Sequence, residues 1–237
     1  MHSTEDSAAT SPDYRSAVQK AEIDVTKVDL LAQKLFNFSL GDNDEFLLLR
    51  EMHHRLANTL TILTSALRRE FAPLALPEFE DSLARYEARL LAFGDLHRAL
   101  VVGAADGMVS VRYYIERLCE ALSEALLKPL GVSCEVFADA GEFPGVRCER
   151  LGLVIAELVT NAAKHAFCGR ESGSVKVELI DRGHCWVCTV SDNGAGPTTA
   201  PPGIGSKILE QLVRSLNGTL IRKSEFHGTS VSVTCQL

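Results

Sequence analysis

Hydrophobic residues in the first half of the chain recur at alternating intervals of three and four, the spacing of a helix with one buried stripe. In the first helix, expected from Glu45 to Phe71, the stripe consists of Phe46, Leu49, His53, Leu56, Leu60, Leu63 and Leu67. In the second, expected from about Glu78 to Val102, it consists of Leu83, Tyr86, Leu90, Phe93, His97 and Leu100. Pro73 and Pro77 bracket a short connection, so the pattern predicts an antiparallel helical hairpin.

One hairpin cannot bury both sides of these stripes. We therefore expect two copies to pair through residues of about 25–102, so that a homodimer forms a four-helix bundle. Residues 1–22 are rich in small and polar side chains and are expected to form a disordered tail. The helical dimerisation domain is expected to span residues 23–106.

The pattern changes after the segment Gly103–Gly107, which indicates a domain boundary. Helices are expected over about 110–128, 148–167 and 204–216, and strands over 132–137, 175–180, 185–190, 219–222 and 230–235. The expected fold class is α+β, with the helical hairpin followed by a mixed α/β domain over residues 107–237.

Charge and composition exclude several classes of protein. The chain has 31 acidic and 24 basic residues, a formal net charge of −7, which argues against a nucleic-acid partner because nucleic acid requires a basic field. No apolar run approaches the ~20 residues that span a bilayer, and the first residues lack a signal-peptide core. We expect a cytoplasmic protein with no membrane span, whose seven scattered cysteines require no disulfide framework.

The helix expected over 148–167 places a carboxylate, an amide, an ammonium and an imidazole on one stripe, opposite its apolar face. These side chains are Glu157, Asn161, Lys164 and His165. Such a stripe is usually a solvated helix face, but two glycine clusters that follow it favour a binding site. The first, Asp192–Gly196, follows a strand, and the second, Gly203–Gly205, opens a helix, where glycine lets phosphate oxygens approach backbone N–H groups.

In this order and spacing the segments resemble the nucleotide-binding motifs of histidine kinases. Glu157–Ala166 resembles the N box, Asp192–Gly196 the first glycine box, Gly203–Gly205 the second, and Gly228–Thr229 the late glycine-threonine pair before the last strand. The resemblance implies a GHKL-type (Bergerat) ATP-binding α/β sandwich, shared with gyrase-type ATPases and certain chaperones, which does not use a P-loop.

The resemblance also implies roles for the site residues, with ATP and Mg²⁺ as cofactors. Asn161 would hold a Mg²⁺ that bridges the phosphates, and Glu157 would orient a metal-bound water or assist proton removal from the attacking imidazole. Lys164 and His165 would neutralise phosphate charge, and Asp192 would accept a hydrogen bond from the adenine amino group. The remaining residues would shape the pocket, its lid and the adenine end: Gly194, Gly196, Gly203, Gly205 and Thr229.

Glu51–Leu60 resembles the H box of the histidine-kinase subfamily with an H-R-x-x-N core. The resemblance implies that His54 accepts the phosphoryl group and passes it to an aspartate of a response-regulator receiver domain. The hydrophobic stripe agrees, because His53 falls on the buried register whereas His54 shares a face with polar residues. We therefore expect His53 and His97 to be core histidines and His54 to be the exposed acceptor.

Some features depart from the family pattern. The segment 197–202 is short for a nucleotide lid and has no phenylalanine box, and Ala57 stands where this subfamily usually has lysine. Residues 1–44 are also too few for a typical sensory domain. A phosphotransfer adaptor with a decayed ATP domain therefore remains an alternative. A GHKL-fold serine kinase acting on an anti-sigma partner and a helical scaffold with an inert α/β domain are further alternatives.

Overall fold

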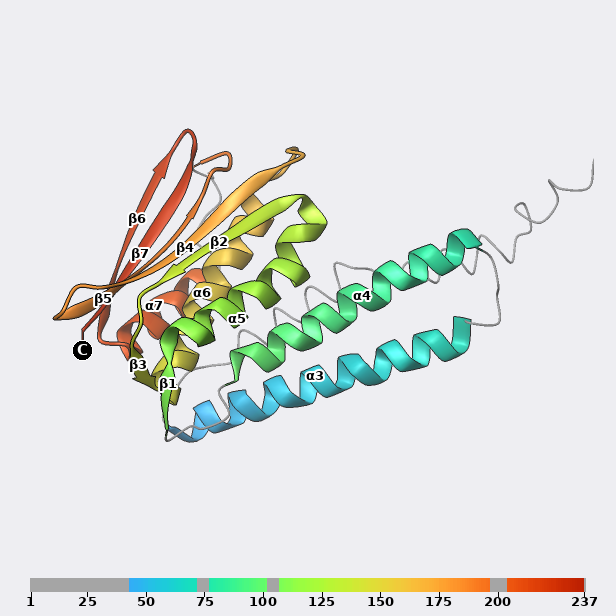
Figure 1. The fold of residues 1–237 in the computed structure, drawn as a ribbon, viewed down its shortest axis with the longest axis horizontal. Helices are drawn as coiled ribbons and strands as arrows, with labels where there is room; N and C mark the ends of the chain where they lie inside the picture. The colour runs from blue at the N-terminus through green and yellow to red at the C-terminus, as the bar shows by residue number, and fades with distance from the viewer. Residues whose placement is uncertain (1–42, 72–76, 102–106, 197–203, 237) are drawn as a thin grey trace, which may run out of the picture. The chain divides into compact units, whose positions relative to one another are not determined.

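The computed structural model describes residues 43–71, 77–101, 107–196 and 204–236, all of which belong to one compact unit of the chain. The expected tail and the beginning of the expected helical domain lie outside the described residues. Two long helices, α3 (Asn43–Phe71) and α4 (Pro77–Leu100), pack along each other as a hairpin (Figure 1). The first and last residues of both helices lie within two residues of the boundaries expected from the hydrophobic pattern.

The core of the hairpin follows the three-four spacing but differs from the expected stripe. Its buried members are His53, Ala57, Leu60 and Thr64 on α3, and Glu87, Gly94, Leu96, His97 and Leu100 on α4. Two residues that the pattern places in the stripe, Leu63 and Tyr86, are 49% and 55% exposed in the single chain. The small residues Ala57 and Gly94 meet where the two helices pack, and a Cβ on Gly94 would make an ordinary van der Waals contact with the Ala57 carbonyl oxygen at 3.7 Å.

The second part of the described chain alternates helices and strands. It begins with β1 (Met108–Ser110), α5 (Val111–Leu122), a π-helical turn (Ser123–Leu127) and a 3₁₀ turn (Lys128–Leu130). It continues with β2 (Val132–Ala138), β3 (Glu142–Pro144), α6 (Gly145–His165), β4 (Gly173–Asp181) and β5 (Cys185–Asp192). The last elements are α7 (Ile204–Ser215), β6 (Gly218–Glu225) and β7 (Gly228–Gln236).

Five strands form one sheet in the order β2-β4-β5-β7-β6, in which only the β2–β4 pair is parallel. The helices α5, α6 and α7 lie against one face of this sheet (Figure 1). Strand residues alternate accordingly, so that Val175, Val177 and Leu179 of β4 are buried beneath the helices. The expected α+β class, a helical part followed by an α/β sandwich, is therefore confirmed.

The differences from the expected elements have local causes. The short strands β1 and β3 pair with each other, and three residues are too few for a period of two to appear in the sequence. The helix expected to begin at Cys148 begins at Gly145, directly after Pro144, which is both the last residue of β3 and the N-cap residue of α6. The helix expected over 110–128 ends at Leu122 and continues as the π-helical and 3₁₀ turns.

Tyr114 of α5 connects the end of α4 to the α/β domain. Its buried hydroxyl donates a hydrogen bond to the Leu100 carbonyl oxygen at 3.2 Å, and burial raises the pKa of Tyr114 well above its ordinary value, so the hydroxyl stays a donor. Gly152 of α6 faces this hydroxyl, and a Cβ there would lie 2.0 Å from the Tyr114 oxygen. Residue 152 must therefore be glycine for the bond to form in this geometry.

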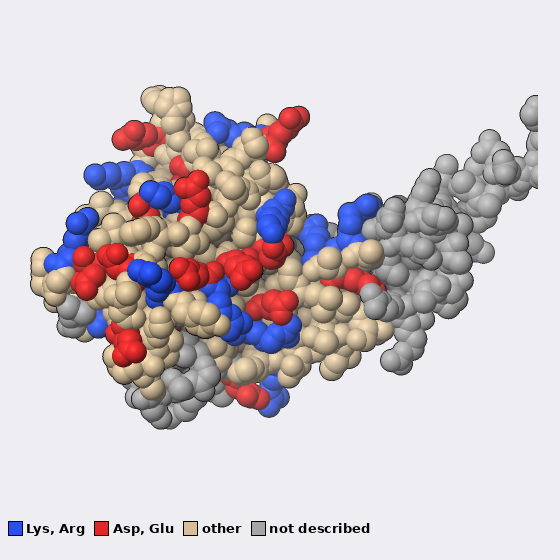
Figure 2. Space-filling view, viewed as in Figure 1, with Lys and Arg blue, Asp and Glu red and all other residues tan. Residues whose placement is uncertain are grey.

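The surface carries charges of both signs. On the face shown in Figure 2, acidic and basic side chains are interspersed and do not gather by sign. None of the helices in the described ranges is long and apolar enough to cross a bilayer.

Candidate nucleotide and phosphoacceptor sites

The carboxylate of Asp192 organises the loop that follows β5. Its Oδ1 atom accepts hydrogen bonds from the backbone N–H of Gly194 at 2.9 Å and from that of Thr229 at 3.3 Å. Its Oδ2 atom has no hydrogen bond to the residues that the structure describes. Asp192 is half-buried, so one oxygen fixes the loop and the other is left to accept a hydrogen bond from a ligand.

Backbone packing explains why glycine occurs at several positions around Asp192. A Cβ on Gly194 would lie 2.3 Å from the Ala166 carbonyl oxygen, and one on Gly228 would lie 1.9 Å from the Asp192 carbonyl oxygen. Gly196 adopts a φ of 79°, and a Cβ there would lie 2.0 Å from the Glu225 carbonyl oxygen. The loop after β5 is thus pressed between the end of α6 and the β6–β7 turn, with no space for larger side chains.

Hydrogen bonds from two other elements hold the same loop. Ala195 donates its backbone N–H to the Ala166 carbonyl oxygen at the end of α6, at 2.9 Å. Asn193 donates its backbone N–H to the Ser174 carbonyl at 3.2 Å and accepts the Ser174 N–H at Oδ1 at 2.8 Å. Arg170 donates to the Asn193 carbonyl oxygen at 2.8 Å. The loop is therefore preorganised by α6, β4 and β7 together.

The polar stripe of α6 is not a solvated helix face. Glu157 is only 9% exposed, and the amide of Asn161 donates a hydrogen bond to its Oε1 atom at 3.3 Å. Burial raises the pKa of the Glu157 carboxyl, while the bond from Asn161 and the charge of Lys164 oppose that rise. Lys164 is half-buried and His165 is exposed, so the stripe passes from buried to solvent-exposed toward the end of the helix.

The remaining expected site residues fall at two places. Thr229 is half-buried at the start of β7, next to Asp192. Gly205 lies in the first turn of α7, whereas Gly203 lies outside the described residues. Among the residues that the structure describes, no three His, Cys, Asp or Glu side chains gather as metal ligands. A metal held here would therefore depend on the amide of Asn161 and on ligands from a bound molecule.

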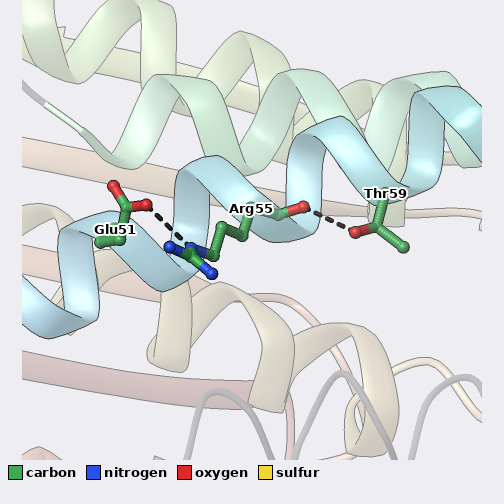
Figure 3. Close-up of polar contacts among 3 residues, drawn as sticks. All are labelled: Glu51, Arg55 and Thr59. Carbon is green, nitrogen blue, oxygen red and sulfur yellow. Dashed lines mark hydrogen bonds and ion pairs between the residues drawn. The ribbon is translucent and has the colours of Figure 1, made fainter.

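The two histidines of α3 have opposite environments, as the stripe predicts. His53 is buried at 6% exposure, whereas His54 is exposed. Beside them, Arg55 forms an ion pair with Glu51 at 2.8 Å, and Thr59 donates its hydroxyl to the Arg55 carbonyl oxygen (Figure 3). Arg55 thus lies along the helix surface, and the imidazole of His54 is accessible to a second domain.

Sequence reasoning missed three features of these sites. Each loop contact of Arg170, Ser174 and Ala166 has a main-chain atom on at least one side, so these contacts leave no side-chain pattern to read. On α4 the buried residue is Glu87, whereas the expected stripe included its neighbour Tyr86. The contact between His53 and His97 could have been anticipated, because both residues were placed on the facing stripes.

Comparison with known families agrees with this geometry. Residues 51–126 match the family model described as histidine kinase, and residues 147–237 match the model described as histidine kinase-, DNA gyrase B-, and HSP90-like ATPase. Together these segments make up more than two thirds of the chain. The chain belongs to the histidine kinase family.

Individual relatives support the same conclusion. Blue-light-activated histidine kinase 2 of Erythrobacter litoralis is 28% identical over 199 residues, which cover 80% of this chain and 57% of the relative. Sensor histidine kinase PdtaS of Mycobacterium tuberculosis is 28% identical over 195 residues, which cover 77% of this chain and 38% of the relative. The chain therefore spans about half the length of these relatives, or less. The solved histidine kinase domain of an Erythrobacter litoralis blue-light activated histidine kinase has a TM-score of 0.52 and 25% identity, over 77% of this chain and 94% of that one.

Proposed function

We propose that this chain transfers the terminal phosphoryl group of ATP to His54 and then to an aspartate on the receiver domain of a response regulator. The observation that carries the proposal is the Asp192 loop, held by main-chain bonds beside the α6 helix that carries the buried Glu157–Asn161 pair. The exposed imidazole of His54 supplies the acceptor on the same chain.

The residues around Asp192 fit an adenine base. One carboxylate oxygen is already bonded to the N–H groups of Gly194 and Thr229, so the carboxylate cannot rotate freely. The other oxygen can accept a hydrogen bond from the exocyclic amino group of the base. A hydrogen bond to a charged acceptor contributes about 1.5–3 kcal/mol, which is enough to favour adenine over bases that lack this amino group.

The side chains on α6 fit the phosphates and a magnesium ion. Asn161 donates its N–H to Glu157, which leaves its amide oxygen free to act as the kind of hard ligand that Mg²⁺ prefers. Lys164 lies one turn further along and adds a positive charge. When bound, the ion neutralises charge on the phosphates.

The chain's own residues then position one nucleophile and one proton acceptor. The neutral imidazole of His54 forms an N–P bond with the terminal phosphorus as the P–O bond to ADP breaks, and the imidazole gives up its N–H proton. Glu157 is suited to assist that proton removal, because a raised pKa makes a carboxylate a better base near neutral pH. His165, exposed next to Lys164 at the end of α6, can donate a ring N–H to a phosphate oxygen.

We also propose that the active form is a homodimer through the hairpin. Apolar side chains on the outer faces of α3 and α4 are exposed in the single chain: Ile62, Leu63, Tyr86 and Leu91, at 68%, 49%, 55% and 42%. A second hairpin would cover them as a four-helix bundle. In this proposal residues 23–106 form the dimerisation and phosphotransfer domain, residues 107–237 form the ATP-binding domain, and the protein works in the cytoplasm.

Autophosphorylation with γ-labelled ATP and Mg²⁺ tests the proposal. The purified chain should acquire an acid-labile, alkali-stable label that disappears in His54→Ala. His184→Ala is a suitable control, because His184 is an exposed histidine at the turn between β4 and β5. A label that persists in His54→Ala would contradict the assignment of His54. A chain that binds no nucleotide but accepts phosphate from a phosphorylated receiver would be an adaptor.

A further inference from the structure

Two buried histidines from different helices contact each other directly beside the proposed phosphoacceptor. The Nδ1 atoms of His53 on α3 and His97 on α4 are 2.8 Å apart, and the ring centroids are 5.0 Å apart. Both residues are 6% exposed. His53 immediately precedes His54, so this contact is one residue away from the reacting imidazole.

When both rings are neutral, the contact requires them to adopt different tautomers. A hydrogen bond between two Nδ1 atoms needs one N–H and one lone pair, so one ring is protonated at Nδ1 and the other at Nε2. Burial, with a smaller contribution from the neighbouring imidazoles of His97 and His54, lowers the pKa of His53 to about 3, and burial lowers that of His97 to about 4. At neutral pH neither ring carries a charge, and the bond persists.

The bond holds His53 toward α4 at the position next to His54, on the same face of α3 as the buried Ala57 and Leu60. Successive residues of an α-helix are about 100° apart around its axis. Because His53 is fixed toward α4, the side chain of His54 is held on the solvent side of the hairpin. A rotation of α3 that broke the pair would turn His54 away from that direction.

We propose that His97 is a positioning residue for His54, acting through its hydrogen bond to His53. This inference rests on the proposed function, in which His54 is the acceptor. Among the described residues, His97 is hydrogen-bonded to His53, and no bond joins it to His54 or to the Asp192 loop. Its loss should therefore slow phosphoryl transfer without changing how tightly ATP binds.

Two substitutions with the same branched side-chain skeleton separate the hydrogen bond from simple packing. His97→Asn places an amide atom close to the position of the imidazole Nδ1, so the bond to His53 is kept. His97→Leu introduces a side chain with a volume close to that of His but with no polar atom. His97→Gln moves the amide one methylene further out, and serves as the second variant if His97→Leu does not fold.

Autophosphorylation of the full chain at saturating ATP gives the first measurement. We expect the rate of His97→Asn to stay within about threefold of the wild type, and that of His97→Leu or His97→Gln to fall about tenfold or more, since small misplacements of a reacting group have large effects on rate. The KM for ATP should be unchanged in all of them. Equal rates in the Asn and Leu variants, or a loss that appears in KM, would overturn the inference.

A second measurement does not depend on kinase activity. The reaction of His54 with diethyl pyrocarbonate, followed by peptide mass spectrometry, reports how its imidazole is presented. We expect the same rate in the wild type and His97→Asn and a changed rate in His97→Leu. The three proteins could show this expected pattern of reaction while the wild type never autophosphorylates. In that case the proposed function fails and the positioning by His97 stands. If the three proteins react alike, the positioning fails whatever the kinase assay shows.

Discussion

The Thr229 backbone N–H and the Asp192 carboxylate are joined by a 3.3 Å hydrogen bond between the beginning of β7 and the end of β5. The residues are 37 positions apart in the chain, and they meet because β5 and β7 are antiparallel neighbours, with Ser191 paired to Ser230. The proposed adenine contact is thus set by the register of the sheet.

Asp192→Asn should weaken nucleotide binding without unfolding the domain. The amide oxygen can still accept the Gly194 and Thr229 N–H groups, but the NH₂ group would face the adenine amino group. We expect the Kd for ATP to rise at least about tenfold, because a charged hydrogen bond is replaced by two donors facing each other. Isothermal titration calorimetry measures this. Asp181→Asn is the matched control, since Asp181 caps the exposed β4–β5 turn through a bond from Gly183, and it should bind ATP normally.

Gly228→Ala should destabilise the α/β domain more than Gly183→Ala. Both glycines have a positive φ, 139° and 81°, but a Cβ on Gly228 would collide with the Asp192 carbonyl, whereas one on Gly183 meets no atom within 4 Å. Strain of this kind costs on the order of 1–3 kcal/mol, and the collision adds to it only at Gly228. Thermal unfolding of the two variants gives the comparison, and equal losses of Tm would contradict the packing described for the loop.

Glu157→Gln should lower the autophosphorylation activity and leave the unfolding temperature equal or higher. The Gln side chain keeps an oxygen for the Asn161 N–H but loses the charge, so autophosphorylation should fall by about 10²–10⁴-fold if Glu157 assists proton removal. Burial raises the pKa of Glu157, so the wild type loses stability as the pH rises through that raised pKa and the carboxyl ionises. The variant has no such loss and should unfold at an equal or higher temperature at pH 7. A variant that is both active and less stable would remove Glu157 from this role.

The buried histidine pair should make the hairpin sensitive to acid. His53 and His97 have pKa values of about 3 and 4 when folded, against about 6.5 in an unfolded chain. Between these limits the unfolded state binds more protons, so stability falls as the pH falls. We expect roughly 2–4 kcal/mol less free energy of unfolding at pH 5 than at pH 7. Denaturant unfolding of His53→Leu/His97→Leu should show a weaker dependence on pH than the wild type.

Leu63→Glu should prevent dimerisation without unfolding the hairpin. Leu63 is 49% exposed in the single chain, so a carboxylate there is tolerated in a monomer but would be buried without a partner in the proposed bundle. Multi-angle light scattering should show a monomer with normal helix content. Ser65→Glu, an exposed position on another side of α3, should remain dimeric. A dimeric Leu63→Glu would place the interface elsewhere.

Much of the fold could be predicted because its long elements carry a clear period. The alternation in β4 and β5 and the three-four spacing in α3 and α4 correspond to real burial. The stripe also included Leu63 and Tyr86, which are exposed in the single chain, because a sequence repeat does not show which residues of the stripe meet the partner helix of the same hairpin and which are left for a second copy. The short strands β1 and β3 had no period to detect.

Part of the candidate site could also be predicted from the sequence, and part could not. Side-chain chemistry indicated Glu157, Asn161 and Asp192, and the structure brings Thr229 to Asp192 and Asn161 to Glu157. The burial of Glu157 could not be read from a polar stripe, since the stripe alone resembles a solvated face. The contribution of Arg170 also could not be read, because it binds a main-chain carbonyl whose position depends on the folded loop.

The absent side chain of Gly152 lets the Tyr114 hydroxyl reach the last carbonyl of α4. Even one added methyl group would push the phenol ring away and release the end of the hairpin from the domain behind it. A substitution there would leave the proposed acceptor His54 and the Asp192 loop chemically intact, yet it would alter the packing between the hairpin and the α/β domain. This glycine therefore governs how closely the hairpin is attached to the α/β domain, independently of the residues proposed to react.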